Sequence, residues 1–327
     1  MHILITGSAG FLGQRLAHRL LEKPQVQSLA LADVMLTPLE HPNVSTHQLD
    51  LTNAQAVYDL VTHLTTKGEL TAVYHLAAVV SGQAEANFDL GMRVNVDGTR
   101  NLLEAIRRKS AGAQFIFASS LAVFGGELPN IIDERTVVTP RSSYGTQKAI
   151  CELLVSDYTR KGYVDGRILR LPTVCVRPGK PNAAASSFVS SIIREPLHGE
   201  LALCPVKRYL PIWLASPNTT VANLVHALTL EAEQFDEHGG NRTVNLPGIT
   251  VTVDEMLKAL AHVTDETFVH QVQMRPDDVI SKIVASWPSR FEVSLARSLG
   301  FAQDDSFEEI IRTYIEEEMP ASAMPQT

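Results

Sequence analysis

The chain has 327 residues, of which 45% are hydrophobic and 20% are charged, and these are ordinary values for a globular protein. A formal net charge of -8 at pH 7 argues against general binding to nucleic acid or to an anionic membrane surface. The three cysteines form no C-x-x-C pair and no apolar run is long enough for a membrane span, so we expect a cytoplasmic protein with reduced thiols.

A glycine-rich turn follows the first apolar segment. Residues 2–6 predict a short strand, and Gly7, Gly10 and Gly13 follow it with the spacing G-x-x-G-x-x-G before a helical pattern begins. Strand, glycine turn and helix in this order form the first half of a βαβ unit. Glycines allow a pyrophosphate to approach the backbone, and a helix N-terminus supplies N–H groups for it. The alternative is a tight turn without a ligand.

An acidic residue ends the second predicted strand. Residues 28–32 read as this strand, and Asp33 follows about 20 residues after Gly13, the spacing of a dinucleotide site. A carboxylate here can accept hydrogen bonds from ribose hydroxyls and repels a 2′-phosphate, so it favours NAD over NADP. The alternative is that Asp33 only caps a turn.

Further strands alternate with helical segments up to residue 171. Strands are expected at 44–48, 71–76, 114–118 and 167–171, with helical segments from residue 52 and over 84–108. This order predicts an α/β fold with a Rossmann-type, doubly wound parallel sheet. Ala77 and Ala78, after the fourth strand, leave room for a flat ligand, and Asp50 could reach an adenine amino group.

Tyr144 and Lys148 stand four residues apart and therefore share one face of a predicted helix. A phenol titrates near 10, and an ammonium beside it favours the phenolate and lowers that pKa. Such a pair can move a proton to or from a substrate hydroxyl. The histidines, in contrast, are scattered without metal-ligand spacing, so no metal site is expected.

Taken together, these segments resemble the extended short-chain dehydrogenase/reductase superfamily, which contains NAD-dependent epimerases and dehydratases. The resemblance implies that Tyr144 is the general acid/base, that Lys148 lowers its pKa and bonds the nicotinamide ribose, and that Ser120 bonds the reacting oxygen. It also implies a set of residues that contact NAD: Gly7, Gly10, Phe11, Leu12, Gly13, Asp33, Asp50, Leu51, Leu76, Ala77, Ala78, Asn95, Ser119, Tyr144, Lys148, Pro172 and Val174.

The second half is expected to hold a smaller substrate domain. We place an NAD-binding domain at 1–171, to which later segments return, and a mainly substrate-binding domain at 172–327. Between residues 177 and 208 there are five basic residues and two acidic ones, which favours an anionic substrate. A solvated basic surface is the alternative. Arg208 is expected to bond a carboxylate, because a guanidinium fork fits it.

The resemblance narrows the substrate. Residues 177–197 and 208–217 are similar to the branch of the superfamily that oxidises D-erythronate, a four-carbon sugar acid, to its 2-keto acid with NAD. The substrate contacts it implies are Ser120, Tyr144, Thr173, Ser187 and Arg208. The resemblance also implies a homodimer.

Two other functions remain open at this stage. A nucleotide-sugar epimerase or dehydratase with tightly bound NAD fits Arg208 and Arg275, but Thr173 stands where those enzymes usually carry Asn. A redox-sensing regulator of the same fold typically lacks the Tyr or the Lys, and both Tyr144 and Lys148 are present here.

Overall fold

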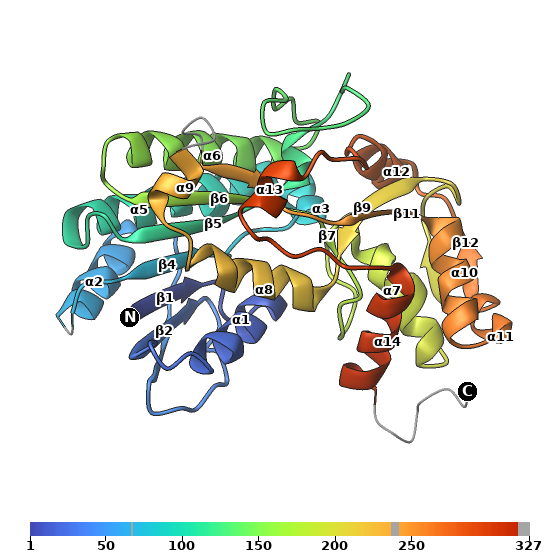
Figure 1. Cartoon of the computed structure of the whole chain (residues 1–327), viewed down its shortest axis with the longest axis horizontal. Coiled ribbons are helices and arrows are strands. Elements are labelled where there is room, and N and C mark those ends of the chain that lie inside the picture. Colours follow the sequence, from blue (N-terminus) through green and yellow to red (C-terminus); the bar gives the residue numbers. More distant parts are fainter. Residues whose placement is uncertain (67, 237–241, 320–327) are drawn as a thin grey trace.

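Seven parallel strands form the central sheet in a computed structural model that describes residues 1–66, 68–236 and 242–319. The strands lie in the order β10-β6-β5-β4-β1-β2-β3 (Figure 1). Their bounds are β1 His2–Thr6, β2 Ser28–Asp33, β3 Val44–Gln48, β4 Ala72–His75, β5 Gln114–Ser120, β6 Asp165–Leu171 and β10 Thr243–Asn245. The chain places β2 and β3 on one side of β1 and then returns to β4 on the other side. The carboxyl ends of β1 and β4 therefore flank a topological switch point, where ligands of such sheets bind. The predicted doubly wound parallel sheet is confirmed.

Helices cover both faces of this sheet, so its inner strands are buried on both sides and read as nearly continuous apolar runs. One face packs against α1 Phe11–Leu21, α8 Pro217–Ala227, α9 Ala232–Asp236 and α13 Ser294–Ser298. The other face packs against α2 Ala54–Thr65, α5 Gly98–Lys109 and α6 Ser143–Arg160. Two hydrophobic cores therefore lie between the sheet and its covering helices, one on each face, and they hold the sheet in place.

The predicted single helical segment over 84–108 is broken in the structure. It contains α3 Ser81–Ala86, α4 Phe88–Gly91, a π-helical turn at Met92–Asp97 and then α5. Asn87 causes the first break, because its side chain accepts a hydrogen bond from the backbone N–H of Leu90 and so starts a new helix.

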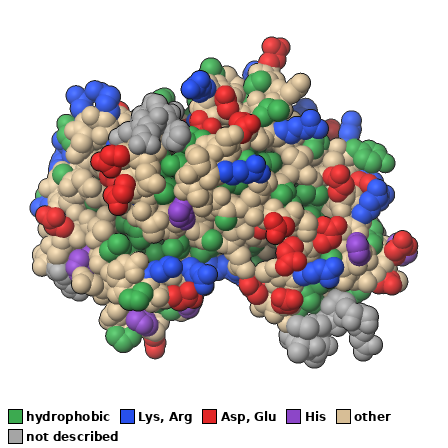
Figure 2. All heavy atoms as spheres, in the orientation of Figure 1, with side chains coloured by type: hydrophobic (Ala, Val, Ile, Leu, Met, Phe, Trp, Pro, Cys, Tyr) green, Lys and Arg blue, Asp and Glu red, His purple; other side chains and the backbone are tan. Residues whose placement is uncertain are grey.

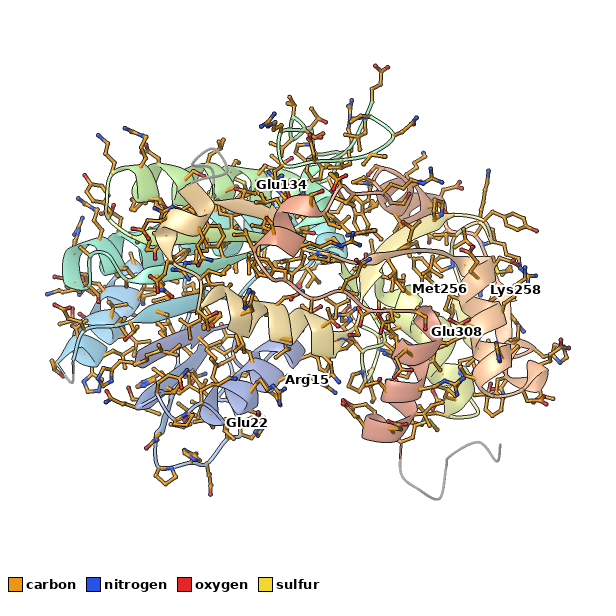
Figure 3. The ribbon with its side chains drawn as sticks, in the orientation of Figure 1. Arg15, Glu22, Glu134, Met256, Lys258 and Glu308 are labelled. Carbon is orange, nitrogen blue, oxygen red and sulfur yellow. The ribbon has the colours of Figure 1, made fainter. Side chains whose placement is uncertain are left out.

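A second, smaller core lies beyond the end of β6. A three-stranded sheet has the order β11-β9-β7, and β8 pairs with β12. Their bounds are β7 Thr173–Val174, β8 Ala202–Cys204, β9 Pro211–Ala215, β11 Ile249–Thr252 and β12 Val272–Met274. The helices here are α7 Ser187–Leu197, α10 Val253–Val263, α11 Glu266–Val269, α12 Asp278–Ala285 and α14 Phe307–Glu318. On α10, Met256 points into this core and Lys258 points away from it (Figure 3).

Contacts between distant segments join the two parts. Arg15 on α1 forms ion pairs with Glu317 and Glu318 on α14, across the hollow at the lower edge of Figure 2. Glu134 lies in the loop after β5 (Figure 3), and its carboxylate accepts a hydrogen bond from the backbone N–H of Asn245 in the edge strand β10. The division near residue 171 stays a prediction, and residues 237–241 and 320–327 of the predicted second domain lie outside the described residues.

The described part of the chain contains no helix that is both long and apolar enough to cross a bilayer. Over the same residues, no group of three or more His, Cys, Asp or Glu side chains could hold a metal ion.

Candidate active site

The turn after β1 brings its backbone close to neighbouring segments. Gly7 has a φ of +77°, and a Cβ on it would lie 2.5 Å from the backbone nitrogen of Ala77. A Cβ on Gly13 would overlap the carbonyl oxygen of Gly7. Larger side chains are therefore excluded, and the N-terminus of α1, which begins after Gly10, stays open to an anion. This cradle fits the pyrophosphate of a dinucleotide.

Two cavities open along the carboxyl edge of the sheet and form one continuous trough. Their volumes are about 330 Å³ and about 550 Å³, and both are lined by Gly7, Gly10, Leu76 and Ala78. The smaller cavity reaches the predicted catalytic residues, and the larger one reaches the end of β2. A trough that runs across the switch point suits an extended dinucleotide.

The structure brings nearly all of the predicted NAD residues to this trough. The residues that line it are Gly7, Gly10, Phe11, Leu12, Gly13, Asp33, Asp50, Leu51, Leu76, Ala77, Ala78, Ser119, Tyr144, Lys148, Pro172 and Val174. Asn95 does not line it. Its side chain is buried, bonds both the N–H and the C=O of Val79, and donates to the Gln147 side chain. Asn95 therefore fixes the segment after β4 from behind the trough.

Asp33 caps the turn after β2, and its ribose-binding role stays a prediction. Its carboxylate accepts hydrogen bonds from the backbone N–H groups of Ala9, at 3.1 Å, and Met35, at 3.3 Å, and Asp33 also lines the larger cavity. A carboxylate offers about four acceptor positions, so capping leaves room for ribose hydroxyls. Arg93, from the π-helical turn, lines the same cavity, and no sequence pattern pointed to it.

Strand β5 and helix α6 place the three predicted catalytic residues together. Ser120 is the last residue of β5, and Tyr144 and Lys148 lie in the first two turns of α6. The start of α6 packs directly on the turn after Ser120, because a Cβ on Gly145 would overlap the carbonyl oxygen of Ala122. All three catalytic candidates line the smaller cavity.

Burial has the largest effect on the pKa values of Tyr144 and Lys148. It raises the pKa of Tyr144 to about 12, against a lowering by hydrogen bonding to Ser120, and it lowers the pKa of Lys148 to about 8. The Lys148 ammonium donates to the carbonyl oxygen of Ala118 at 2.7 Å and lies 5.7 Å from the centre of the Tyr144 ring. The pKa of Tyr144 is therefore raised and not lowered as the spacing to Lys148 predicted, since burial outweighs the hydrogen bond from Ser120.

His75, at the end of β4, is a structural residue. Its two ring nitrogens lie 2.7 Å from the Thr6 hydroxyl and 2.8 Å from the Thr99 hydroxyl, and the side chain is fully buried. Burial, with a smaller contribution from Lys148, lowers the pKa of His75 to about 3, so the ring is neutral.

A buried ion pair lies beneath the catalytic residues. Glu152 accepts hydrogen bonds from Arg170 at 2.9 and 2.7 Å and from the Ser119 hydroxyl at 2.5 Å. The two charged side chains are only 7% and 5% exposed, and the guanidinium also stacks on the Phe124 ring at 4.7 Å. This network ties α6 to β5 and β6, and sequence spacing did not predict it.

On the substrate side, the structure brings some predicted residues to the cleft and leaves others outside. Thr173 lines the smaller cavity together with Arg177, Asn182 and Trp287, which sequence reasoning did not single out as contacts. Ser187 does not line it. The Ser187 hydroxyl accepts a hydrogen bond from the backbone N–H of Asn182 at 3.1 Å, and Ser187 lines a separate cavity.

Arg208 is also outside the cleft, which corrects the expectation that it bonds the substrate. Its Nε donates to Asp254 at 2.7 Å, its side chain is 48% exposed, and it lines none of the cavities described above. The local excess of basic residues was real, but it did not reveal which side chain turns inward. A carboxylate at the start of α10 holds Arg208 on the surface.

Comparisons with known proteins identify the family of the chain. Residues 3–245 match the model of the NAD dependent epimerase/dehydratase family. The chain is 49% identical over 323 residues to the D-erythronate dehydrogenase of Haemophilus influenzae, covering 98% of this chain and 100% of that relative. It is 47% identical over 327 residues to the D-erythronate dehydrogenase of Cupriavidus necator, covering 97% and 98%. The crystal structure of the nucleoside-diphosphate-sugar epimerase from Agrobacterium tumefaciens superposes with a TM-score of 0.90 at 41% identity, covering 99% of this chain and 96% of that one.

A parallel sheet with a glycine cradle at its switch point, and Ser, Tyr and Lys side chains at the same edge, defines an extended short-chain dehydrogenase/reductase. The chain belongs to the NAD dependent epimerase/dehydratase family. The predicted family and the predicted cofactor, NAD, are thereby confirmed.

Proposed function

We propose that the protein oxidises the 2-hydroxyl of D-erythronate to the 2-keto acid with NAD. The observation that carries this proposal is that Ser120, Tyr144 and Lys148 line one cavity that continues into the glycine cradle. Identity of 49% and 47%, over nearly the whole chain, to two proteins named D-erythronate dehydrogenase supports the choice of sugar acid.

The side chains divide the work as follows. The Ser120 hydroxyl donates to the reacting oxygen and holds it, and the Tyr144 phenolate accepts the hydroxyl proton. Lys148 fixes the start of α6 on β5 through Ala118 and favours the phenolate. NAD⁺ held by Gly7, Gly10 and Gly13 would supply the acceptor for the hydride of the same carbon. The alcohol loses one proton and one hydride, and the products are the 2-keto acid, NADH and a proton.

A nucleotide-sugar epimerase is the second candidate, because the 41%-identical crystal structure bears that name. Absorbance of NADH at 340 nm separates the two functions. A dehydrogenase accumulates NADH when D-erythronate is added, whereas an epimerase returns the hydride to its substrate and accumulates none. Turnover of a nucleotide sugar without net NADH, combined with inactivity on D-erythronate, would contradict the proposal.

We also propose that the protein is a cytoplasmic homodimer that pairs through α5 and α6. Leu153, on the outer side of α6, is 69% exposed, and such a residue suits a helix-to-helix interface. The cysteines Cys151, Cys175 and Cys204 are all unpaired, as expected in a reducing compartment. Light scattering should give the mass of a dimer for the native chain and of a monomer for Leu153→Glu. A native monomer would contradict the proposed assembly.

A further inference from the structure

The backbone of Arg177 is held from both sides by one helix. Its N–H donates to the Ser190 hydroxyl at 3.0 Å, and its carbonyl oxygen accepts a hydrogen bond from Arg194 at 2.8 Å. Ser190 and Arg194 are four residues apart on α7 and so lie on one face of it. Arg194 is itself neutralised by Glu195 at 2.6 Å. The main chain at residue 177 is therefore fixed in position before any ligand arrives.

The guanidinium of Arg177, by contrast, is left unsatisfied. Its Nε is buried and has no hydrogen-bond partner among the described residues. Its Nη2 donates to the Asn182 side-chain oxygen at 3.5 Å, the outer limit for a hydrogen bond. Within the described part of the chain, no carboxylate lies within ion-pair distance of it. Burial lowers the pKa of the group, which still stays cationic at neutral pH. Arg177 as a whole is half-buried, and a ligand in the cavity can supply the acceptor that its buried Nε lacks.

The chemistry of the proposed reaction limits where an anion-binding residue must lie. In a 2-hydroxy acid the carboxylate carbon is bonded directly to the carbon that loses the hydride. The residue that binds the carboxylate must therefore line the same cavity as Ser120 and Tyr144. Arg177 lines that cavity, and Arg208 and Lys180 do not.

We infer that Arg177 binds the carboxylate of the substrate and so selects sugar acids over neutral sugars. This inference rests on the proposed function, since it assigns the acid group of that substrate. The guanidinium provides two parallel N–H donors for the two carboxylate oxygens, which also orients the neighbouring hydroxyl toward Ser120. Asn182 and Trp287, on the same wall, are left to contact the remaining hydroxyls.

The test compares an acid with its neutral counterpart. NADH formation is measured with D-erythronate and with D-erythronamide, which keeps the carbon chain and hydroxyls but carries no charge. For Arg177→Ala, KM for the acid should rise about 10- to 100-fold, the value of a lost charge-assisted pair. KM for the amide and KM for NAD⁺ should change less than about twofold, because neither involves the carboxylate contact. For Arg177→Lys, KM for the acid should lie between the native value and that of Arg177→Ala, since Lys keeps the positive charge without the two parallel N–H donors of the guanidinium.

Two further variants make the test specific. Lys180 lies three residues after Arg177 and does not line the cavity, so Lys180→Ala removes a nearby positive charge outside the site. Arg208→Ala removes the other arginine that was considered as the carboxylate-binding residue. Neither should change the preference for the acid. A large rise in KM for Arg208→Ala together with unchanged KM for Arg177→Ala and Arg177→Lys would overturn the inference. Partial rescue of Arg177→Ala by added ethylguanidinium would support it independently of folding.

Failure of the proposed substrate is distinguishable from failure of this inference. If the native enzyme oxidises a different C3–C6 sugar acid, the D-erythronate assignment fails, and the acid and amide of that substrate then test Arg177. If the native enzyme oxidises neutral polyols as readily as any acid, there is no carboxylate site and the inference is wrong.

Discussion

The ammonium nitrogen of Lys148 lies 2.7 Å from the carbonyl oxygen of Ala118, which joins the second turn of α6 to strand β5. Tyr144 lies one turn before Lys148, and Ser120 lies two residues after Ala118 at the end of the strand. This hydrogen bond therefore helps to set the position of Tyr144, the proposed proton acceptor, relative to Ser120, the residue proposed to hold the substrate oxygen.

Tyr144→Phe should abolish most of the oxidation while leaving the cofactor bound. The phenol oxygen is the proton acceptor in the proposed mechanism, and general acid/base groups contribute about 10²–10⁴-fold to rate. Steady-state NADH formation should show kcat reduced by that range, with NADH affinity measured by fluorescence nearly unchanged. Tyr209→Phe, a matched change at a 76% exposed ring, should keep full activity. Full-speed turnover by Tyr144→Phe would rule out the assigned role.

The oxidation rate should rise with pH. The active form of Tyr144 is deprotonated, and burial raises the pKa of this phenol, so activity is present above the apparent pKa and is lost as pH falls through it. This limb of the profile, the pH range in which activity falls off, should lie below pH 12 when NAD⁺ is bound, because the positive charge of the nicotinamide ring favours the phenolate. A log plot of kcat/KM should have a slope of about one on this limb. Lys148→Met should move the limb to higher pH; an unmoved limb would contradict a role for that charge.

Asp33→Ala should weaken the preference for NAD over NADP. The change removes an acceptor for ribose hydroxyls and a charge that repels a 2′-phosphate, so kcat/KM for NAD should fall about 10- to 100-fold while that for NADP rises. Asp33→Asn is the matched control, because an amide oxygen can still accept from the N–H groups of Ala9 and Met35. For Asp33→Asn, kcat/KM for NADP should rise, and kcat/KM for NAD should fall less than it does for Asp33→Ala. An unchanged cofactor ratio in both variants would mean that Asp33 only caps the turn.

Arg170→Met should destabilise the fold by about 3–5 kcal/mol, because it leaves the Glu152 carboxylate buried without its partner. Urea denaturation measures the loss. The double variant Arg170→Met/Glu152→Met should recover most of it, since both buried charges are then gone. Arg160→Met breaks an exposed pair with Asp157 and should leave the midpoint nearly unchanged. Equal loss in the single and double variants would show that packing, and not the ion pair, is responsible.

Local patterns predicted the central sheet and most of the trough. The glycine spacing, Asp33 after β2 and small residues after β4 each depend on a few neighbouring residues, and all of these residues line the trough. Tyr144 and Lys148 were predictable because helical spacing alone puts them on one face.

Features that depend on contacts between distant segments were not predictable in this way. Asn95 turned behind the trough because its side-chain oxygen accepts a hydrogen bond from the N–H of Val79 and its side-chain N–H donates to the Gln147 oxygen. Arg208 turned outward toward Asp254. Arg177 turned inward because α7 holds its backbone, although both arginines belong to the same basic run. Charge counting along a sequence carries no information about these directions.

The parallel pairing of β10 with β6 has a consequence for biosynthesis. A ribosome delivers six strands of the sheet well before residues 243–245 emerge, and until then β6 presents a free edge of unpaired amide and carbonyl groups. Such an edge recruits other strands and promotes self-association. A truncated product that stops at Leu171 should therefore aggregate more readily than the full chain, which light scattering would detect.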